Sequence, residues 1–488
     1  MLMKLKEFFT ARQSPAFLVG GYLRDSLLSR PLGRDIDIAL SGDSQSVGRE
    51  LSLALGGTFV PLSPSHGKAR VVAPEPGVGP WNVDLSSFSG TIEEDLARRD
   101  FTINALALPL SSWGELMPGE LVIDPFDGRP DLVRKCIRAV GPHVFRDDPG
   151  RLLRAVRLAA GLGFRLAPET ARMALSDASH VERVAGERLR DEFLAILALD
   201  GAKASLDALD RLDLLCRIIP ELADTKGVDQ PIVHYWDVWG HLLHAVESAE
   251  RITKGHQHSP IYTLVYWTAE TDAYFSQEVS DGHSRRTLLK LAALFHDIAK
   301  PQTKEKDENG RTRFPGHSEA GAVVAAKRLA HLRVGSRGIN MVAQMVEHHL
   351  RPAHMMQGVE APTNRAIYRY FRDLGDVAVD TLYLSQADYL AAKGPQLNPD
   401  DWANHARMIA HIVKAGFQPH ALTAPRRLVN GNDLIKRFAL NPGPIIGLLL
   451  AGIDEARAAG EISTREEALA MAAETLGQHR EGVSPWRR

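Results

Sequence analysis

The sequence has few cysteines, no long apolar run and almost no net charge, and each shortage argues against a class of protein. Its 488 residues include only two cysteines, Cys136 and Cys216, which lie far apart and outside any Cys/His ligand spacing. A disulfide framework and a thiolate zinc site are therefore not expected, and a reducing cytoplasm fits. The N-terminus lacks the apolar core of a signal peptide, and no apolar run reaches the ~18 residues that a membrane span needs. We therefore expect a cytoplasmic protein with no membrane partner.

The formal net charge of −2 means that any binding to nucleic acid must come from local basic patches. Residues 129–165 form such a patch, with nine Lys or Arg against three Asp or Glu. An ordinary solvated helix face accounts for some of these charges. The length predicts about three or four domains, because one hydrophobic core does not grow to this size.

Changes in pattern divide the chain into four parts and predict an α+β fold. Short β-like runs (AFLVGG, DIDIAL, NVDLSSF and ELVIDPF) alternate with helical segments over residues 1–143. Apolar residues at helical spacing then predict a helical layer over 144–225. Residues 226–395 are rich in helices and histidines, and within them 254–286 is expected to be an insertion or a mobile connection. A helical C-terminal region follows over 396–488.

The stretch GRDIDIAL places two aspartates at the centre of a run that otherwise fits a buried strand. Because side chains alternate along a strand, Asp35 and Asp37 should lie on one face while Ile36 and Ile38 enter the core. Two neighbouring carboxylates repel unless a cation lies between them, and Mg²⁺ commonly binds one or two carboxylates together with substrate phosphates. Two such ions can activate a hydroxyl and stabilise a leaving pyrophosphate. If the two aspartates are considered without their neighbours, a solvated strand end with no metal is the alternative interpretation.

The glycines upstream of this pair fit the same chemistry. Gly20 and Gly21 are predicted to form a strand-to-helix turn, where backbone N–H groups and a helix N-terminus could approach a triphosphate. Arg24, one turn into that helix, could add a positive charge. If the two glycines are considered by themselves, a tight turn that binds no ligand is the alternative interpretation.

A glycine turn followed by a carboxylate pair resembles the nucleotidyltransferase superfamily that includes DNA polymerase beta. That superfamily commonly carries a third carboxylate on a neighbouring strand, and Asp84 in WNVDLSSF is the candidate, with a surface aspartate as the alternative. The segment EEDLARRDFTINALAL (93–108) is similar to the class II tRNA nucleotidyltransferase and poly(A) polymerase family. That resemblance implies that Arg99, Asp100 and Asn104 hold the sugar and phosphates of the incoming nucleotide. By itself, the segment predicts only a charged helix start running into an apolar helix.

The segment RDDPGRLLRAVRLAAGLGF places Asp148 three residues before Arg151 at a helix start. Aspartate accepts hydrogen bonds and arginine donates them, so the pair could present a mixed edge to a base; an N-cap aspartate beside a helix arginine is the alternative. In the class II family a DxxR element selects CTP and ATP without a template, and these two residues match it. The acidic residue before it, usually Glu, is Asp147 here. Arg154 and Arg157 continue the helix and could bind triphosphate or the tRNA acceptor end.

A second candidate site centres on the apolar helix LLKLAALFHDIAKP, which ends in His296 and Asp297. Adjacent His and Asp side chains are costly in a core unless they bind a metal or each other. An earlier VWGHLLH contributes His241 and a later LYLSQADYLAA contributes Asp388. Together these elements resemble the HD phosphohydrolase domain, in which an H…HD…D set binds one divalent ion.

Two further histidine segments, PGHSEAG with His317 and MVEHHLRP with His348 and His349, match HD members that hold two ions. Of the adjacent pair, His349 is the preferred ligand. The ion could be a transition metal or Mg²⁺, and metal-bound water could attack a phosphoester such as a 2′-phosphate or 2′,3′-cyclic phosphate end. A domain kept for tRNA binding, with little turnover, is the alternative.

The resemblance runs from about residue 16 to 480 and implies template-independent, divalent-metal-dependent addition of C and A to tRNA 3′ ends from CTP and ATP. The same resemblance implies four domains. Residues 1–143 would form the catalytic domain and 144–225 a neck that reads the base and binds RNA. Residues 226–395 would form an HD domain and 396–488 a tRNA-binding tail.

One departure from the family pattern concerns which nucleotides are added. VDLSSFSG runs almost directly into TIEEDLARRD and leaves little room for the flexible loop of enzymes that complete CCA, so CC-only or other partial addition stays open. Poly(A) polymerase is an alternative of the same class. A hydrolase or RNA-binding protein with an inactive transferase domain is an alternative of another class.

Overall fold

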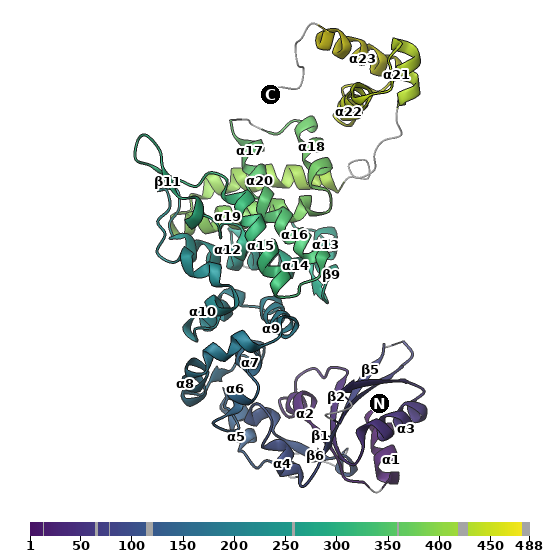
Figure 1. Cartoon of the computed structure of the whole chain (residues 1–488), viewed down its shortest axis with the longest axis vertical. Coiled ribbons are helices and arrows are strands. Elements are labelled where there is room, and N and C mark those ends of the chain that lie inside the picture. Colours follow the sequence, from purple (N-terminus) through teal and green to yellow (C-terminus); the bar gives the residue numbers. More distant parts are fainter. Residues whose placement is uncertain are drawn as a thin grey trace. The chain divides into compact units, whose positions relative to one another are not determined.

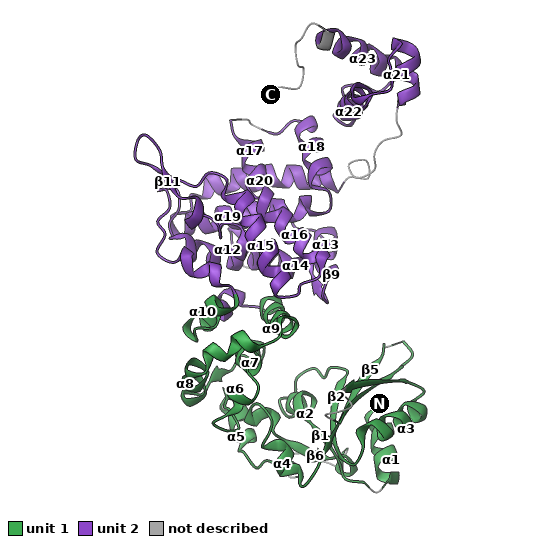
Figure 2. Ribbon diagram, in the orientation of Figure 1, with its two compact units in different colours: residues 1–199, 207–218 green, residues 200–206, 219–488 purple. Residues whose placement is uncertain are grey.

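The computed structural model describes residues 1–12, 14–63, 67–77, 79–113, 121–255, 259–358, 361–417 and 428–480. The chain divides into two compact units, one of residues 1–199 and 207–218 and the other of residues 200–206 and 219–488 (Figures 1 and 2). The first contains a β-sheet and the second is mostly helical, which confirms the expected α+β fold. The finer division at residues 143, 225 and 395 stays a prediction. None of the described helices is long and apolar enough to cross a membrane.

A six-stranded sheet with strand order β3-β4-β5-β2-β1-β6 forms the centre of the first unit. Strands β2 and β5 pair in parallel, and the other neighbours pair antiparallel. Its members are β1 (Ala16–Val19), β2 (Asp35–Ser41), β3 (Thr58–Ser63), β4 (Lys68–Ala73), β5 (Trp81–Phe88) and β6 (Ala107–Pro109). Three of the four predicted β-like runs are therefore strands. In the fourth, ELVIDPF, only Ile123 pairs, with Ala107, in an isolated bridge, because Pro125 has no N–H to continue a ladder; Glu120 lies outside the described residues.

Four helices accompany the sheet: α1 (Leu2–Arg12), α2 (Gly20–Leu27), α3 (Ser44–Leu55) and α4 (Ile92–Leu96). The apolar helix predicted for the second half of 93–108 is wrong. After α4 the chain forms a 3-10 turn, η2 (Thr102–Asn104), and then enters β6. The Asp100 carboxylate fixes this turn, because it accepts hydrogen bonds from the Phe101 N–H at 2.7 Å and from Asn104 Nδ2 at 3.1 Å. The apolar residues that follow are buried as a sheet edge rather than as a helix face.

Residues 144–225 are helical as predicted, apart from the short strand β8 (Arg165–Leu166), which pairs with β7 (Cys136–Ile137). Helices α7 and α9 pack against each other in the first unit. The helices after β6 are α5 (Gly128–Val133), α6 (Val144–Asp147), α7 (Arg151–Leu162), α8 (Pro168–Ser176), α9 (Gly186–Ala198), α10 (Ala202–Arg211) and α11 (Leu215–Ile218).

The second unit is built around α14 (Arg285–Phe295), in which every residue except Arg286 is buried. It is contacted by α12 (Val238–Ile252), α13 (Ala269–Ser276), α15 (His317–His331), α16 (Ser336–His348) and α19 (Ala378–Lys393) (Figure 1). The expected insertion at 254–286 therefore contains a helix, α13, that packs on α14 and carries a fully buried Phe275. The remaining helices are α17 (Arg351–Met356), α18 (Asn364–Leu374), α20 (Pro399–Gly416), α21 (Gly431–Phe438), α22 (Pro444–Ala458) and α23 (Arg465–Arg480).

Candidate functional site

The central strands of the sheet place three carboxylates on one face. In the parallel register of β2 and β5, Asp37 lies opposite Asp84 and Asp35 lies opposite Asn82. Side chains of paired residues share a face, so the three acidic groups form one row, and Ile36 and Ile38 enter the core as predicted. Asn82 Nδ2 donates a hydrogen bond to Asp35 Oδ1 at 2.8 Å. Such a set of oxygen donors fits a divalent cation.

Asp37 is the carboxylate of this row whose ionised form is disfavoured by its surroundings. Burial raises the pKa of its carboxyl group, and the negative charges of Asp84 and Asp35 raise it further, while Arg99 and Arg154 act in the opposite direction. No residue in the described part of the chain donates a hydrogen bond to its side chain. A half-buried carboxylate without a donor is the group that gains most from a bound cation.

The turn from β1 into α2 brings the main chain against this carboxylate. Gly20 has a φ of +74°, and a Cβ atom on it would lie 2.7 Å from Asp37 Oδ2, so no other residue fits without a shift. Four residues on, the buried Arg24 donates from Nη1 to Asn104 Oδ1 at 2.9 Å and from Nε to Asp25 Oδ1 at 2.9 Å. Arg24 therefore ties the helix after the glycines to the turn at 102–104.

A cleft of about 670 Å³ opens in front of the carboxylates. Its walls carry more arginine and lysine than acidic side chains, which suits a polyanionic ligand such as a triphosphate. Three further basic residues outside the predicted set also line it: Lys68, Arg98 and Arg188. All predicted transferase residues except Asp35 line this cleft: Gly20, Gly21, Arg24, Asp37, Asp84, Arg99, Asp100, Asn104, Asp148, Arg151, Arg154 and Arg157.

Carboxylates hold the arginines of α7 in fixed positions along the cleft. Arg154 Nε lies 2.8 Å from Asp100 Oδ2, and Arg157 Nε donates to Glu192 Oε2 at 2.6 Å. The first pair joins α7 to the turn after α4, and the second pair joins α7 to α9. Orienting the guanidinium groups before a ligand arrives lowers the entropy that binding would otherwise cost.

The predicted base-reading pair has a third member that the sequence did not reveal. Arg188 on α9 contacts both oxygens of Asp148, with Nη1–Oδ1 and Nη2–Oδ2 distances of 3.0 Å. Arg151 Nε lies 3.8 Å from Asp148 Oδ2, and its Nη2 donates to the Arg98 carbonyl oxygen at 2.7 Å. Burial would raise the pKa of Asp148, but the hydrogen bond and charge of Arg188, the charge of Arg151 and the Gly150 N–H together outweigh it and lower the pKa. Asp148 is therefore an ionised acceptor with a fixed orientation.

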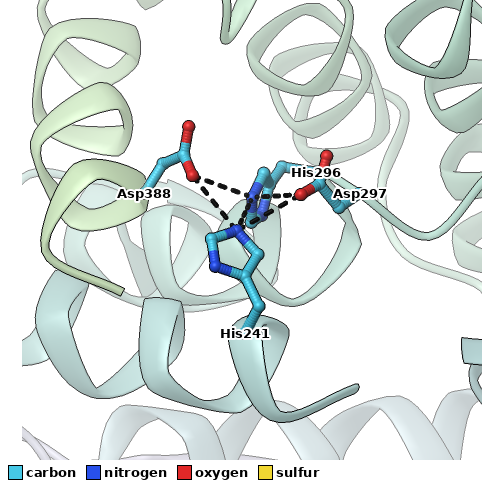
Figure 3. Close-up of side chains that lie close together, drawn as sticks. All are labelled: His241, His296, Asp297 and Asp388. Atoms are coloured by element: carbon cyan, nitrogen blue, oxygen red, sulfur yellow. Dashed lines mark hydrogen bonds and ion pairs between the residues drawn. The ribbon is translucent and has the colours of Figure 1, made fainter. Parts of the chain in front are cut away.

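In the second unit, the predicted H…HD…D residues converge from three helices (Figure 3). His241 on α12 and His296 at the end of α14 point their Nε2 atoms at each other across 3.0 Å. The carboxylates of Asp297 and Asp388 approach the same point, at 3.2 and 3.1 Å from His241 Nε2. Two imidazole nitrogens at this distance share either a proton or a metal ion, and a donor set of two His and two Asp fits a divalent metal.

Asp297 also belongs to a second group with His317 and His349. Its Oδ1 lies 3.2 Å from His317 Nε2 and 3.7 Å from His349 Nε2. In both histidines Nδ1 faces the carbonyl oxygen three residues earlier, at 2.6 and 2.7 Å, which leaves Nε2 as the ligand atom. Among the described residues, Asp297 Oδ1 and His317 Nε2 find no hydrogen-bond partner although both atoms are buried, as expected of atoms placed to hold an ion.

The charges of this site favour a cation at its centre. Burial would lower the pKa of His296, but Asp297 and Asp388 raise it to about 10. By contrast, burial and the neighbouring His296 lower the pKa of His349 to about 4. Lys300, which is not one of the predicted site residues, places Nζ 2.5 Å from Asp297 Oδ2. A bound divalent ion would take over the place of the His296 proton between the two carboxylates.

Comparison with known proteins places these two sites in a family. The model of the HD domain matches residues 238–393, that of the poly A polymerase head domain matches 79–138, and that of the probable RNA and SrmB-binding site of polymerase A matches 163–226. A CC-adding tRNA nucleotidyltransferase of Thermus thermophilus is 33% identical over 473 residues, which cover 95% of this chain and 94% of the relative.

The chain belongs to the class II tRNA nucleotidyltransferase family with an HD domain. An A-adding tRNA nucleotidyltransferase of Deinococcus radiodurans is 32% identical over 464 residues, covering 93% of this chain and 94% of that relative. The fold matches the Thermotoga maritima CCA-adding enzyme complexed with tRNA, with a TM-score of 0.62, 21% identity and coverage of 97% and 95%. This tRNA nucleotidyltransferase is an enzyme whose polymerase-beta-like and HD domains imply the use of divalent metal.

Proposed function

We propose that this tRNA nucleotidyltransferase adds nucleotides from CTP or ATP to tRNA 3′ ends without a template. The observation that carries the proposal is one cleft that combines the Asp37 carboxylate, a row of oriented arginines and the Asp148 acceptor. The relatives that match nearly the whole chain are named for CC addition and for A addition to tRNA.

In this proposal Asp35 and Asp37 hold Mg²⁺, with Asp84 beside them. Bound there, the ion would supply activation of the tRNA 3′ hydroxyl and charge neutralisation on the leaving pyrophosphate. Arg24 and Arg99, which line the same cleft, contact the triphosphate, and the main chain at Gly20 and Gly21 approaches it closely. These roles follow from charge and position.

The sugar and base are held by the remaining wall of the cleft. Asp100 and Asn104 form hydrogen bonds with the sugar, and Arg154 and Arg157 contact phosphates. Asp148 accepts from the amino group of cytosine or adenine while Arg151 donates to a ring nitrogen or carbonyl. Protein side chains thereby replace the template strand.

We further propose that the product is CC rather than CCA. Only residues 89–91 connect β5 to α4, and a capping box fixes them: the Glu94 N–H bonds the Thr91 side chain at 3.3 Å, and the Thr91 N–H bonds Glu94 Oε2 at 3.2 Å. A Cβ on Gly90 would collide with Glu94, so the connection is tight as well as short. The family's flexible loop, which helps to switch from C to A, has no room here.

The test is incubation with one tRNA that lacks CCA and one that ends in CC, supplied with CTP and ATP separately and together. Product length is read at single-nucleotide resolution. We expect two cytidines on the first tRNA and no extension of the second; addition of A to either would refute CC-only addition. Asp37→Asn should abolish incorporation, whereas Asp213→Asn, which changes a carboxylate outside the cleft, should not.

The same experiment separates the alternatives. Processive ATP addition to unrelated RNA would identify a poly(A) polymerase. Phosphoester cleavage without any incorporation would identify a hydrolase with an inactive transferase domain.

We also propose a hydrolytic activity for the HD site, because its facing His241 and His296 nitrogens and the paired Asp297 and Asp388 suit a metal that activates water. Mn²⁺-dependent or Mg²⁺-dependent release of phosphate from 2′-phosphorylated or 2′,3′-cyclic RNA ends tests it. His296→Ala should abolish that release and leave CTP incorporation intact.

A further inference from the structure

Arg70 on β4 occupies both oxygens of the third carboxylate. In the antiparallel register of β4 and β5 it lies directly opposite Asp84. Its Nε donates to Oδ1 at 2.6 Å and its Nη2 donates to Oδ2 at 2.8 Å. This two-point geometry is the strongest that a guanidinium and a carboxylate form, and it uses the oxygens that a metal would need.

The three carboxylates of the row are therefore not equivalent. Asp84 gives both oxygens to Arg70, and Asp35 gives one oxygen to Asn82. Asp37 has no hydrogen-bond donor among the described residues. With Arg70 paired to Asp84, the row presents a net charge of about −2 to an incoming cation rather than −3.

We propose that Arg70 keeps Asp84 away from the divalent ion while no nucleotide is bound, so that the ion binds firmly only together with a triphosphate. This inference rests on the proposed function, because the ion is that of the transfer site. Asp35 and Asp37 alone form a weak site, and the phosphate oxygens of the nucleotide complete it. Arg70 is thus a positioning residue, which acts through Asp84.

The charge of the site explains why such a residue matters. The affinity of an oxygen site for a cation rises with the number of charged ligands. Three ionised carboxylates would hold the ion in the absence of nucleotide. With only Asp35 and Asp37 available and Asp84 paired to Arg70, the site binds the ion weakly until the triphosphate supplies further oxygen ligands. The ion and the substrate therefore bind together.

A purely structural role for Arg70 is the competing explanation. Cross-strand charge pairs also stabilise a sheet, though only modestly where both side chains are about one-third exposed, as here, at 36% and 30%. Loss of stability in a variant therefore does not distinguish the two roles. Metal affinity in the absence of nucleotide does.

The experiment is a titration of the nucleotide-free full chain with Tb³⁺, followed by tryptophan-sensitised luminescence. Tb³⁺ is a hard cation that prefers the carboxylate row to the histidine-rich HD site. We expect Arg70→Gln to bind Tb³⁺ about tenfold more tightly than the unsubstituted chain, because Asp84 becomes available. The double variant Arg70→Gln/Asp84→Asn should return to the original affinity, and Arg70→Lys should lie between.

Arg217→Gln is the matched control, because Arg217 pairs with Asp213 and Glu182 outside the cleft. It should leave Tb³⁺ affinity unchanged. With CTP present, the difference between Arg70→Gln and the unsubstituted chain should shrink.

An Arg70→Gln affinity equal to or weaker than that of the unsubstituted chain would overturn the inference, as would a double variant that still binds tightly. If circular dichroism shows Arg70→Gln unfolded, Arg70→Lys decides, and unchanged affinity in it overturns the inference. Failure of the unsubstituted chain to incorporate CTP, with the Tb³⁺ pattern as expected, would refute the proposed function alone.

Discussion

Arg188 binds Asp148 through two parallel contacts of 3.0 Å, although the two residues are forty positions apart and lie on different segments. The pair keeps Asp148 ionised and fixes the direction of its oxygens. A carboxylate that reads a base must be an acceptor in one defined orientation, because a protonated or rotated group would present a different edge.

The first prediction concerns this pair. Arg188→Gln should raise the pKa of Asp148 and free its side chain to rotate. We expect kcat/KM for CTP to fall by about tenfold to a hundredfold and discrimination against UTP to weaken. Single-turnover incorporation with each nucleotide measures both quantities. Arg190→Gln, on the same helix but paired with Asp191, is the control and should behave like the unsubstituted chain; equal losses in both variants would contradict the assignment.

The second prediction concerns the glycine that approaches Asp37. In Gly20→Ala the new methyl group meets Asp37 Oδ2 and the residue must keep a φ of +74°. We expect a loss of about 1–2 kcal/mol of stability and a fall in incorporation of about a hundredfold or more.

Gly21→Ala is the matched comparison for that variant, because its Cβ would make only an ordinary contact, with Arg24 Nη2 at 3.6 Å. Its losses should be clearly smaller, as measured by thermal melting and by incorporation rate. Equal losses would show that the crowding at Asp37 is unimportant.

The third prediction concerns a trade of stability for function at Asp37. Its folded-state pKa is raised above that of the unfolded chain, so its ionisation disfavours folding at any pH above both values. Asp37→Asn should therefore raise the melting temperature at pH 7 in metal-free buffer by about 1–4 °C while abolishing incorporation. The difference in melting temperature should shrink as the pH falls through the raised folded-state pKa, and it should vanish below the unfolded-state pKa. The Asp37 carboxyl group is then neutral in both states, as the asparagine side chain is. A lower melting temperature at pH 7 would contradict this account.

The fourth prediction concerns proton release at the HD site. His296, with a pKa of about 10, is protonated at pH 8 and must lose its proton to bind a metal, whereas His349, with a pKa of about 4, is already neutral. Binding of the first ion should release about one proton, and affinity should rise about tenfold per pH unit below 10.

Calorimetric titration with Mn²⁺, in buffers that differ in ionisation enthalpy, measures that proton. The Asp37→Asn chain, with its transferase site disabled, restricts the signal to the HD site. Binding without dependence on pH or buffer would show that His296 is neutral before the ion arrives.

Local patterns in the sequence were enough to predict several features of the structure. Alternation in DIDIAL placed Asp35 and Asp37 on the polar face of a strand, and the glycines before them formed the predicted turn into a helix. Helical spacing located the HD histidines on or beside their helices. Motif resemblance supplied the family, which the comparisons confirm.

The tertiary structure decided which of those residues meet and which partners they acquire. Arg70 and Arg188 belong to no motif, and their roles exist only because β4 lies beside β5 and α9 beside the start of α7. The turn at 102–104, which the sequence predicted as helix, depends on hydrogen bonds that the Asp100 carboxylate accepts and on the sheet edge that follows. Periodicity reports only which face of an element is apolar. The pairing of charges across strands and helices depends on register and packing between residues distant in the chain, and that information is absent from any local pattern.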